Sequence, residues 1–128
     1  MTAGSQGVDA TRLALAIAPH ATANPGKSGI HALPSPSNAF AARVALAAAA
    51  DRTLDIQYYI WHHDETGILL LEALWQAAER GVRVRLLLDD SGTSGLDGIV
   101  ATLDAHPNVE VRFYNPMFHR WFKPINYV

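Results

Sequence analysis

The stretch Arg80-Gly-Val-Arg-Val-Arg-Leu-Leu-Leu-Asp-Asp90 decides the fold of this chain. Gly81 stands where the end of a helix favours a residue that tolerates positive φ. The apolar run from Val82 to Leu88 is short and bounded by glycine and aspartate, which is typical of a strand. The stretch therefore predicts a helix, a tight junction at Gly81 and a strand that ends in a polar loop.

Two helices and another strand are expected upstream of this junction. After Pro36, apolar residues recur at helical spacing, and Ser37 or Asn38 is predicted to cap that helix. Thr53–Trp61 alternates and becomes apolar or aromatic on both faces towards its end, as a buried strand does. Thr66 is predicted as the N-cap of the following helix. That helix carries an apolar stripe made of Leu70, Leu71, Leu74, Ala77 and Ala78.

The same alternation continues downstream. A Ser/Gly/Thr loop at 91–95 leads into an apolar helix over Leu96–Leu103, and Pro107-Asn108 turns the chain into a strand over Val109–Phe113. Helices that alternate with strands favour a parallel sheet with right-handed crossovers. The predicted fold class is α/β, with a parallel βαβαβ sheet flanked by helices.

Three segments are expected along the chain. Residues 1–36 are rich in proline and glycine and are predicted as an irregular leader with a short helix at Thr11–Ala18. Residues 37–116 form the α/β segment. Residues 117–128 are an aromatic-rich tail in which the pattern dissolves, so the tail is interpreted as truncated. The missing next strand would leave apolar surface exposed, and poor solubility is predicted.

Composition excludes several classes of function. The 128 residues contain 49% hydrophobic and 17% charged residues, which is a globular balance. The absence of cysteine excludes disulfides, zinc–thiolate sites and cysteine nucleophiles. A formal net charge of −2 gives no electrostatic case for nucleic acid. No signal peptide or membrane-spanning run is recognisable, so a cytoplasmic location is expected, with contact at the inner face of the cytoplasmic membrane left open.

Two phosphate-binding patterns were weighed against simpler interpretations. Residues 21–28 fit a loose phosphate-loop pattern, but no strand of the sheet precedes them and prolines follow, which favours an ordinary loop. Asp89 at the end of a predicted strand is similar to the nucleophile of haloacid-dehalogenase-like phosphotransferases. The second acid usual in those phosphatases is replaced by Ser91, which favours a polar strand-end loop.

The histidines do not form a recognisable metal-binding motif. His62 and His63 are adjacent, so regular strand structure points them to opposite faces. His106 and His119 have no supporting context, and Gly92-x-x-Gly95 is too short to indicate RNA binding. Neither a catalytic residue nor a cofactor or metal ligand is assigned.

Several segments together resemble the phospholipase D superfamily, in particular the first part of bacterial cardiolipin synthases, from roughly residue 12 onward. The resemblance is carried by Leu54-Asp-Ile-Gln-Tyr-Tyr-Ile-Trp61, Asp64-x-Thr-Gly67, Leu69-Leu-Leu-Glu-Ala-Leu74, the stretch 80–90 and His106-Pro-Asn-Val-Glu-Val-Arg-Phe-Tyr-Asn-Pro116. Ser28-Gly-Ile-His31 also fits the subgroup without transmembrane helices. The order and spacing of these segments carry the match, since each is weak alone.

The resemblance implies phosphodiester exchange or hydrolysis on phospholipids without a metal cofactor. The family uses two H-x-K-x-x-x-x-D motifs, in which one histidine attacks phosphorus and the other protonates the leaving alcohol. An H-x-K needs a histidine two residues before a lysine. The lysines of this chain are Lys27 and Lys123, and the residues at those positions are Pro25 and Trp121, so the chain contains no H-x-K. His119 and Lys123 have the wrong spacing.

The prediction is therefore a catalytically incomplete N-terminal fragment of a cardiolipin synthase-like phosphatidyltransferase, an incomplete half of the phospholipase D-like fold. Its expected partners are a phospholipid substrate in the intact protein and the missing C-terminal part or another phospholipase D-like chain. The prediction leaves open whether the chain is the product of a truncated gene, one piece of a split gene or an expressed piece of a longer protein. It also leaves open whether the intact enzyme is a hydrolase or a transferase. The alternatives are a non-catalytic partner-binding α/β module and a small phosphotransferase using Asp89.

Overall fold

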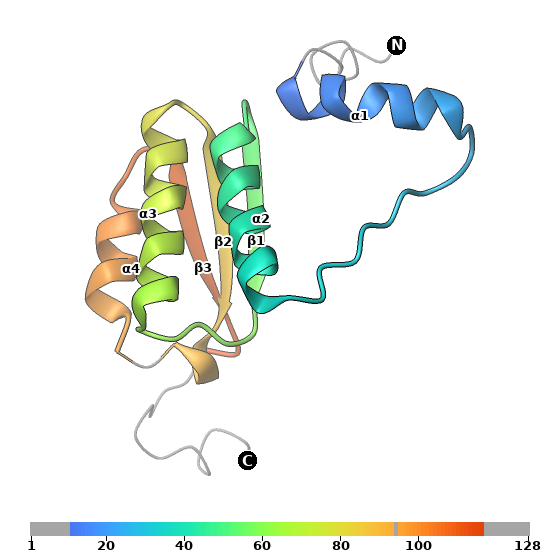
Figure 1. Cartoon of the computed structure of the whole chain (residues 1–128). Helices are drawn as coiled ribbons and strands as arrows, with labels where there is room; N and C mark the ends of the chain where they lie inside the picture. Colours follow the sequence, from blue (N-terminus) through green and yellow to red (C-terminus); the bar gives the residue numbers. More distant parts are fainter. Residues whose placement is uncertain (1–10, 94, 117–128) are drawn as a thin grey trace.

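The computed structural model describes residues 11–93 and 95–116, and a parallel three-stranded sheet lies at its centre (Figure 1). The strands are β1 (Thr53–Tyr58), β2 (Arg83–Asp89) and β3 (Val109–Tyr114), arranged in the order β1-β2-β3. Leu54 pairs with Val84, and Val84 with Val109. The predicted parallel α/β arrangement is confirmed.

Three helices cover one face of this sheet. When successive right-handed crossovers step in one direction, each connecting helix lies on the same face. Figure 1 shows α2, α3 and α4 side by side in front of the strands, whereas α1 lies apart from them. The helices are α1 (Arg12–Ala23), α2 (Pro36–Ala49), α3 (Glu65–Glu79) and α4 (Asp97–Asp104), and a short 3₁₀ turn, η1 (Asp90–Gly92), follows β2.

The hydrophobic core lies between the sheet and these three helices. From Arg83 to Leu88 every second residue of β2 is buried, so this strand contributes Val84, Leu86 and Leu88 to the core. Leu74 of α3 is 1% exposed and lies at its centre. The predicted stripe of α3 is confirmed, since all of its members are buried: Leu70, Leu71, Leu74, Ala77 and Ala78.

The junction at Gly81 has the predicted geometry. Gly81 has φ +89°, its backbone N–H donates to Ala78 O at 2.9 Å, and the N–H of Val82 donates to Ala77 O at 3.1 Å. These two bonds satisfy carbonyls at the end of α3 and turn the chain towards β2. Three residues, Arg80 to Val82, therefore connect the helix to the strand, and the glycine among them makes the turn.

The predicted caps of α2 and α3 were wrong by two or three residues. The N-cap of α3 is Asp64, whose side chain accepts from Gly67 N at 2.8 Å, and the Thr66 hydroxyl donates to the same oxygen. A carboxylate is the stronger acceptor, so Thr66 supports the cap rather than forming it. The N-cap of α2 is Ser35, and the helix begins at Pro36. Proline is suited to this first position because the N–H that it lacks would have no hydrogen-bond partner within the helix.

The first strand is shorter and less buried than predicted. It ends at Tyr58, and Tyr59 is 70% exposed. Among the described residues, β1 pairs only with β2, and Thr53, Asp55 and Gln57 are exposed on the face away from the helices. The expectation of a strand buried on both faces was wrong because no described element covers that side.

The first helix is longer than the Thr11–Ala18 expected, since α1 continues through Pro19 to Ala23. Thr11 caps it by accepting from Ala14 N at 3.2 Å, and the many alanines favour continuation past the proline. None of the residues of α1 is buried. Among the described residues, no helix has the length and hydropathy needed to cross a bilayer.

Candidate functional site at the carboxyl ends of the strands

The loops after the three strands gather at one edge of the sheet. In open parallel sheets, ligands bind beyond the carboxyl ends of the strands. Here that edge is formed by residues 59–64 after β1, by η1 and Thr93 after β2, and by Asn115 after β3. These loops carry aromatic, histidine and carboxylate side chains, which makes this edge the candidate site.

Trp61 holds the first two loops together. Its backbone N–H donates to Gly92 O at 3.1 Å, and its indole Nε1 donates to Gly67 O at 3.3 Å. Its ring, 4% exposed, meets the ring of Tyr58 edge-on with centroids 4.7 Å apart. One buried residue thus connects the end of β1 and the start of α3 through its side chain, and η1 through its backbone.

The two glycines that contact this tryptophan have no room for a side chain. A Cβ at Gly67 would lie 2.1 Å from His62 O, and a Cβ at Gly92 would lie 2.4 Å from Tyr59 O. Both neighbouring atoms belong to the backbone, so relief would require the loops to separate. Glycine is needed at these positions for close approach of two backbone segments.

Asp89 is held in a network of hydrogen bonds. Its Oδ1 accepts from the backbone N–H of Ser91 at 2.9 Å and from the Ser91 hydroxyl at 2.5 Å. The Ser91 hydroxyl, together with the Ser91 backbone and the Asn115 side chain, lowers the pKa of Asp89, although burial opposes the shift. Asn115 adopts φ +50°. Asp89 thus connects η1 with the end of β3, which is the role of a polar strand-end loop.

Aromatic residues line a hollow of about 320 Å³ at this edge. The Tyr58 hydroxyl is buried and has no hydrogen-bond partner among the described residues. The guanidinium carbon of Arg43 lies 5.7 Å from the centre of the Tyr58 ring. The hollow is lined by Gln57, Tyr58, Tyr59, Leu87, Asp89, Tyr114 and Asn115.

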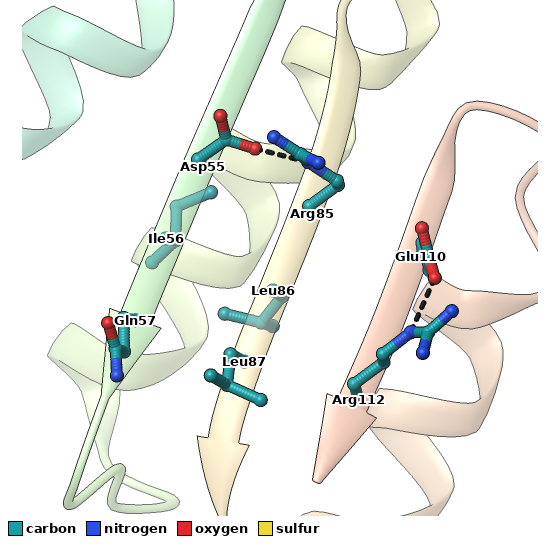
Figure 2. A pocket seen from close by; sticks show the side chains of 8 residues that line it. All are labelled: Asp55, Ile56, Gln57, Arg85, Leu86, Leu87, Glu110 and Arg112. Atoms are coloured by element: carbon teal, nitrogen blue, oxygen red, sulfur yellow. Dashed lines mark hydrogen bonds and ion pairs between the residues drawn. The ribbon is translucent and has the colours of Figure 1, made fainter. Parts of the chain in front are cut away.

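A second hollow, of about 530 Å³, lies on the sheet face that the helices leave open (Figure 2). Arg85 Nε donates to Asp55 Oδ1 at 2.5 Å across β1 and β2, and Arg112 Nε donates to Glu110 Oε1 at 2.6 Å along β3. The hydrogen bond from Arg85 lowers the pKa of Asp55. Charge pairs therefore cover this face, where a solvated sheet needs polar residues.

The other residues weighed in the sequence are scattered. Residues 21–28 span the end of α1 and an exposed turn, and no helix follows them until α2. His62 and His63 are exposed after β1. Throughout 11–93 and 95–116, no group of three histidine, aspartate or glutamate side chains is placed to hold a metal ion. His119 and Lys123 lie outside the described residues.

His106 has a structural role that the sequence did not reveal. Its Nδ1 accepts from the Asn108 backbone N–H at 3.1 Å, so Nε2 carries the proton that is directed at Glu79 Oε1, 3.1 Å away. Its ring packs edge-on against Trp75 with centroids 4.9 Å apart. These contacts fix the turn before β3, at the end of the sheet opposite the candidate site.

Sequence reasoning missed the aromatic residues of the edge as a group. From the sequence, Tyr58, Tyr59 and Trp61 are interpreted as strand residues and as part of the resemblance, and Tyr114 and Asn115 as part of the resemblance, but they are not placed together. The available signal was the clustering of aromatic and amide side chains where strands were predicted to end. Their convergence depends on strand pairing and register, which set Asp89 opposite Tyr114.

The chain is similar to bacterial cardiolipin synthases. It is 52% identical over 117 residues to cardiolipin synthase C of Escherichia coli K12, covering 91% of this chain and 25% of that protein. It is 34% identical over 79 residues to cardiolipin synthase 1 of Bacillus cereus, covering 61% of this chain and 16% of that protein. An uncharacterized Helicobacter pylori (strain 26695) protein is 35% identical over 97 residues, which cover 76% of this chain and 19% of that protein.

The fold also resembles that of a solved structure. The archaeal chromatin protein TrmBL2, described as showing a novel mode of DNA binding, matches with a TM-score of 0.54 and 16% identity, over 82% of this chain and 42% of its own. At that identity the likeness concerns the fold alone.

No protein-family model matches the chain. The chain spans a quarter or less of the curated relatives named above. The identity to the cardiolipin synthases nevertheless extends over nine-tenths of this chain in the E. coli comparison, which includes most of the described sheet and helices. By sequence, this protein is therefore a cardiolipin synthase-like member of the phospholipase D superfamily that corresponds to part of its relatives' length.

Proposed function

We propose that this chain supplies the first part of a phosphatidyltransferase of the cardiolipin synthase type and is catalytically incomplete by itself. The observation that carries the proposal is the 52% identity to E. coli cardiolipin synthase C over 91% of the chain. The 128 residues contain no H-x-K, so they lack both copies of the H-x-K-x-x-x-x-D motif of the family. In this proposal the βαβαβ unit is the N-terminal section of a phospholipase D-like fold.

The role proposed for the unit is to build and position one wall of the reaction site. In a double-displacement mechanism, a histidine displaces the first alcohol from phosphorus and a second alcohol then displaces the histidine. Those histidines would come from outside this chain. The edge formed by Trp61, Gly92 and Asp89 supplies a rigid support, because hydrogen bonds join its loops. A rigid support matters because small misplacements of reacting groups slow the reaction steeply.

A phospholipid is the proposed substrate of the complete protein, and the inner face of the cytoplasmic membrane is the proposed location. Support comes from the printed function of the relatives, which names cardiolipin as the product. Both statements concern the complete protein rather than the α/β unit.

A chimeric enzyme tests the proposal. The matching region of E. coli cardiolipin synthase C would be replaced by the corresponding 117 residues of this chain. We expect the chimera to form cardiolipin on phosphatidylglycerol vesicles, measured by mass spectrometry, and the 128-residue chain alone to form none. A folded but inactive chimera would contradict the proposed role, and turnover by the chain alone would contradict its incompleteness. A chimera that also carries Gly92→Ala serves as the control, because the added Cβ prevents the loops of the site edge from assembling.

A non-catalytic partner-binding module is the second candidate. The open sheet face favours it, because a hollow of about 530 Å³ lies there and no described element covers it. The partner would be a second phospholipase D-like polypeptide that contributes its own helices to this face. Light scattering after size-exclusion chromatography with a phospholipase D-like partner tests this candidate. A complex lost in the Arg85→Glu variant but kept in Lys27→Glu would support it.

A further inference from the structure

We propose that residues 11–35, here called the arm, bind the surface of a membrane that contains anionic phospholipids. The arm consists of α1 and the exposed segment that joins it to α2. The choice of a lipid partner rests on the proposed function, but the binding itself requires no turnover. Exposed apolar side chains, charge distribution and the position of the arm each support the proposal.

Half of the exposed large hydrophobic side chains of the described residues lie in the arm. Leu15 and Ile17 of α1 are 61% and 60% exposed, and Ile30 is 94% exposed. Apart from Arg12 at its start, α1 carries no Lys, Arg, Asp or Glu, and its uncharged polar side chains are His20 and Thr22. The large apolar side chains of the arm are Leu13, Leu15, Ile17, Ile30 and Leu33.

The charges of the arm are opposite in sign to those of the rest of the described chain. The arm contains Arg12 and Lys27 and no acidic residue. Residues 36–116 contain eleven acidic residues against six arginines. Arg12 is paired with Asp51, so Lys27 is the basic group by which an anionic surface attracts the arm, while the same surface repels the net negative α/β unit.

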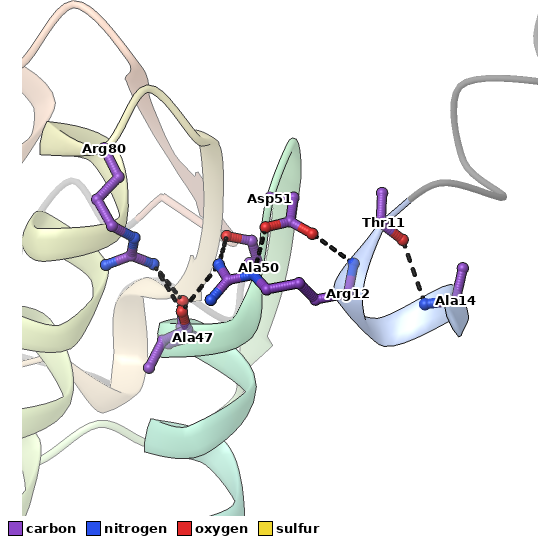
Figure 3. Close-up of polar contacts among 8 residues, drawn as sticks. Thr11, Arg12, Ala14, Ala47, Ala50, Asp51 and Arg80 are labelled. Carbon is purple, nitrogen blue, oxygen red and sulfur yellow. Dashed lines mark hydrogen bonds and ion pairs between the residues drawn. The ribbon is translucent and has the colours of Figure 1, made fainter. Parts of the chain in front are cut away.

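The arm is attached near both ends of α2, and Figure 3 shows the contacts at the C-terminal end. At its beginning, Arg12 donates from its backbone N–H to Asp51 Oδ2 and from Nε to Asp51 Oδ1, both at 2.6 Å. Its guanidinium also donates to Ala48 O and Ala50 O at 3.3 and 3.4 Å. At its end the arm runs into the N-cap of α2 at Ser35.

The arm therefore begins beside the end of α2 and returns to its start, and the segment between loops away from the sheet (Figure 1). This geometry presents the apolar side chains outward without disturbing the core, in which no arm residue takes part. A segment tied at two points loses less freedom on binding than a loose terminus does. The arm can thus contact a lipid surface while the site edge stays intact.

Vesicle flotation of the 128-residue chain tests the proposal. We expect the chain to float with vesicles of phosphatidylglycerol and phosphatidylcholine, at least fivefold more than with phosphatidylcholine alone, and high salt to reduce binding because it screens the charges. The Leu15→Glu/Ile17→Glu variant should lose at least tenfold in binding. Lys27→Glu should lose a smaller factor, mainly at low salt.

Two controls separate the arm from the α/β unit. Leu46 of α2 and Leu69 of α3 are 51% and 44% exposed, so Leu46→Glu/Leu69→Glu makes the same double change of charge outside the arm and should leave binding within twofold. Urea unfolding should show that the arm variant retains the stability of the α/β unit, since no arm residue is in the core. Equal loss in both variants would overturn the proposal.

Three other outcomes would overturn it. The first is equal binding to neutral vesicles, and the second is unchanged binding of the arm variant. The third is self-association of the chain in the absence of lipid that the arm variant loses, because the arm would then bind a second copy of the chain. An inactive chimera combined with arm-dependent flotation would contradict the proposed function alone. Flotation reports binding and the chimera reports turnover, so the two failures are distinguishable.

Discussion

Arg12 and Asp51 are joined by two hydrogen bonds, one from the backbone N–H and one from Nε, each at 2.6 Å. The residues are 39 positions apart, and the pair ties the start of α1 to the end of α2. α2 has no basic residue in its own last turn. Arg12 and Arg80 supply guanidinium groups to its last carbonyls instead, where a cation is favoured (Figure 3).

The first prediction concerns the pH dependence of this pair. The backbone hydrogen bond from Arg12, followed by its side-chain bond, lowers the pKa of Asp51. For a carboxylate with a lowered pKa, the stabilisation is present above the ordinary aspartate value and is lost as pH falls through the folded-state value. In NMR spectra, we expect the Arg12 amide resonance to titrate with a midpoint below that of an ordinary aspartate. The titration should vanish in Asp51→Asn. The amide of Ala14, which is bonded to the Thr11 hydroxyl, serves as a control that should not titrate.

The second prediction concerns Gly92 at the site edge. Gly92→Ala places a Cβ 2.4 Å from Tyr59 O, so the loops after β1 and β2 must separate. Overpacking against backbone costs about 1–3 kcal/mol of unfolding free energy, which urea denaturation measures. Gly98 in α4 has open space around its Cβ position, and Gly98→Ala should stabilise the chain by about 0.4–1 kcal/mol. Equal effects of the two substitutions would show that the close approach at Gly92 is absent.

The third prediction distinguishes the two residues that could cap α3. Asp64 accepts the cap bond from Gly67 N, whereas Thr66 only donates to Asp64. The bond from the Gly67 N–H, followed by that from the Thr66 hydroxyl, lowers the pKa of Asp64. Asp64→Ala should therefore destabilise the chain more than Thr66→Ala does at neutral pH, in urea denaturation of both variants. The difference should shrink as pH falls through the lowered pKa of Asp64. A larger loss of stability in Thr66→Ala than in Asp64→Ala would support the prediction from the sequence that Thr66 is the N-cap.

The fourth prediction concerns Asp89. Its hydrogen bonds with Ser91 and Asn115 indicate a structural role, so Asp89→Asn should lower the melting temperature by several degrees. Because the pKa of Asp89 is lowered, its contribution should be present above the ordinary aspartate range and lost on acidification. The wild-type chain and the variant should both be inactive towards p-nitrophenyl phosphate. Phosphatase activity that the substitution abolishes would instead favour the alternative of a small phosphotransferase.

Much of the fold could be predicted because its signals are local. The run from Arg80 to Asp90 contains a helix end, a glycine with positive φ and a strand, and each of these follows from neighbouring residues. The bounds of α3 and β2 differ little from the prediction for the same reason. The caps were harder, since serine, threonine, asparagine and aspartate compete over a few positions and only the backbone path selects one.

The site edge and the open face were not predictable in the same way. The hydrogen bond between Trp61 and Gly92 joins residues from different strand ends, and no local pattern encodes it. The burial of β1 was overestimated because apolar alternation does not reveal whether a second layer covers a sheet. The position of α1 also depends on a pair 39 residues apart.

The sequence by itself determined the parallel α/β order, the core stripe of α3 and the relationship to cardiolipin synthases, because periodicity, glycine placement and residue identity are properties of the chain. Only the tertiary structure decided that Trp61 joins the end of β1, the start of α3 and η1, that Asp55 and Arg85 cover an open sheet face, and that Arg12 ties the arm to α2. Such contacts depend on strand register and on the directions of helices, which are set when distant parts of the chain pack together rather than by neighbouring residues.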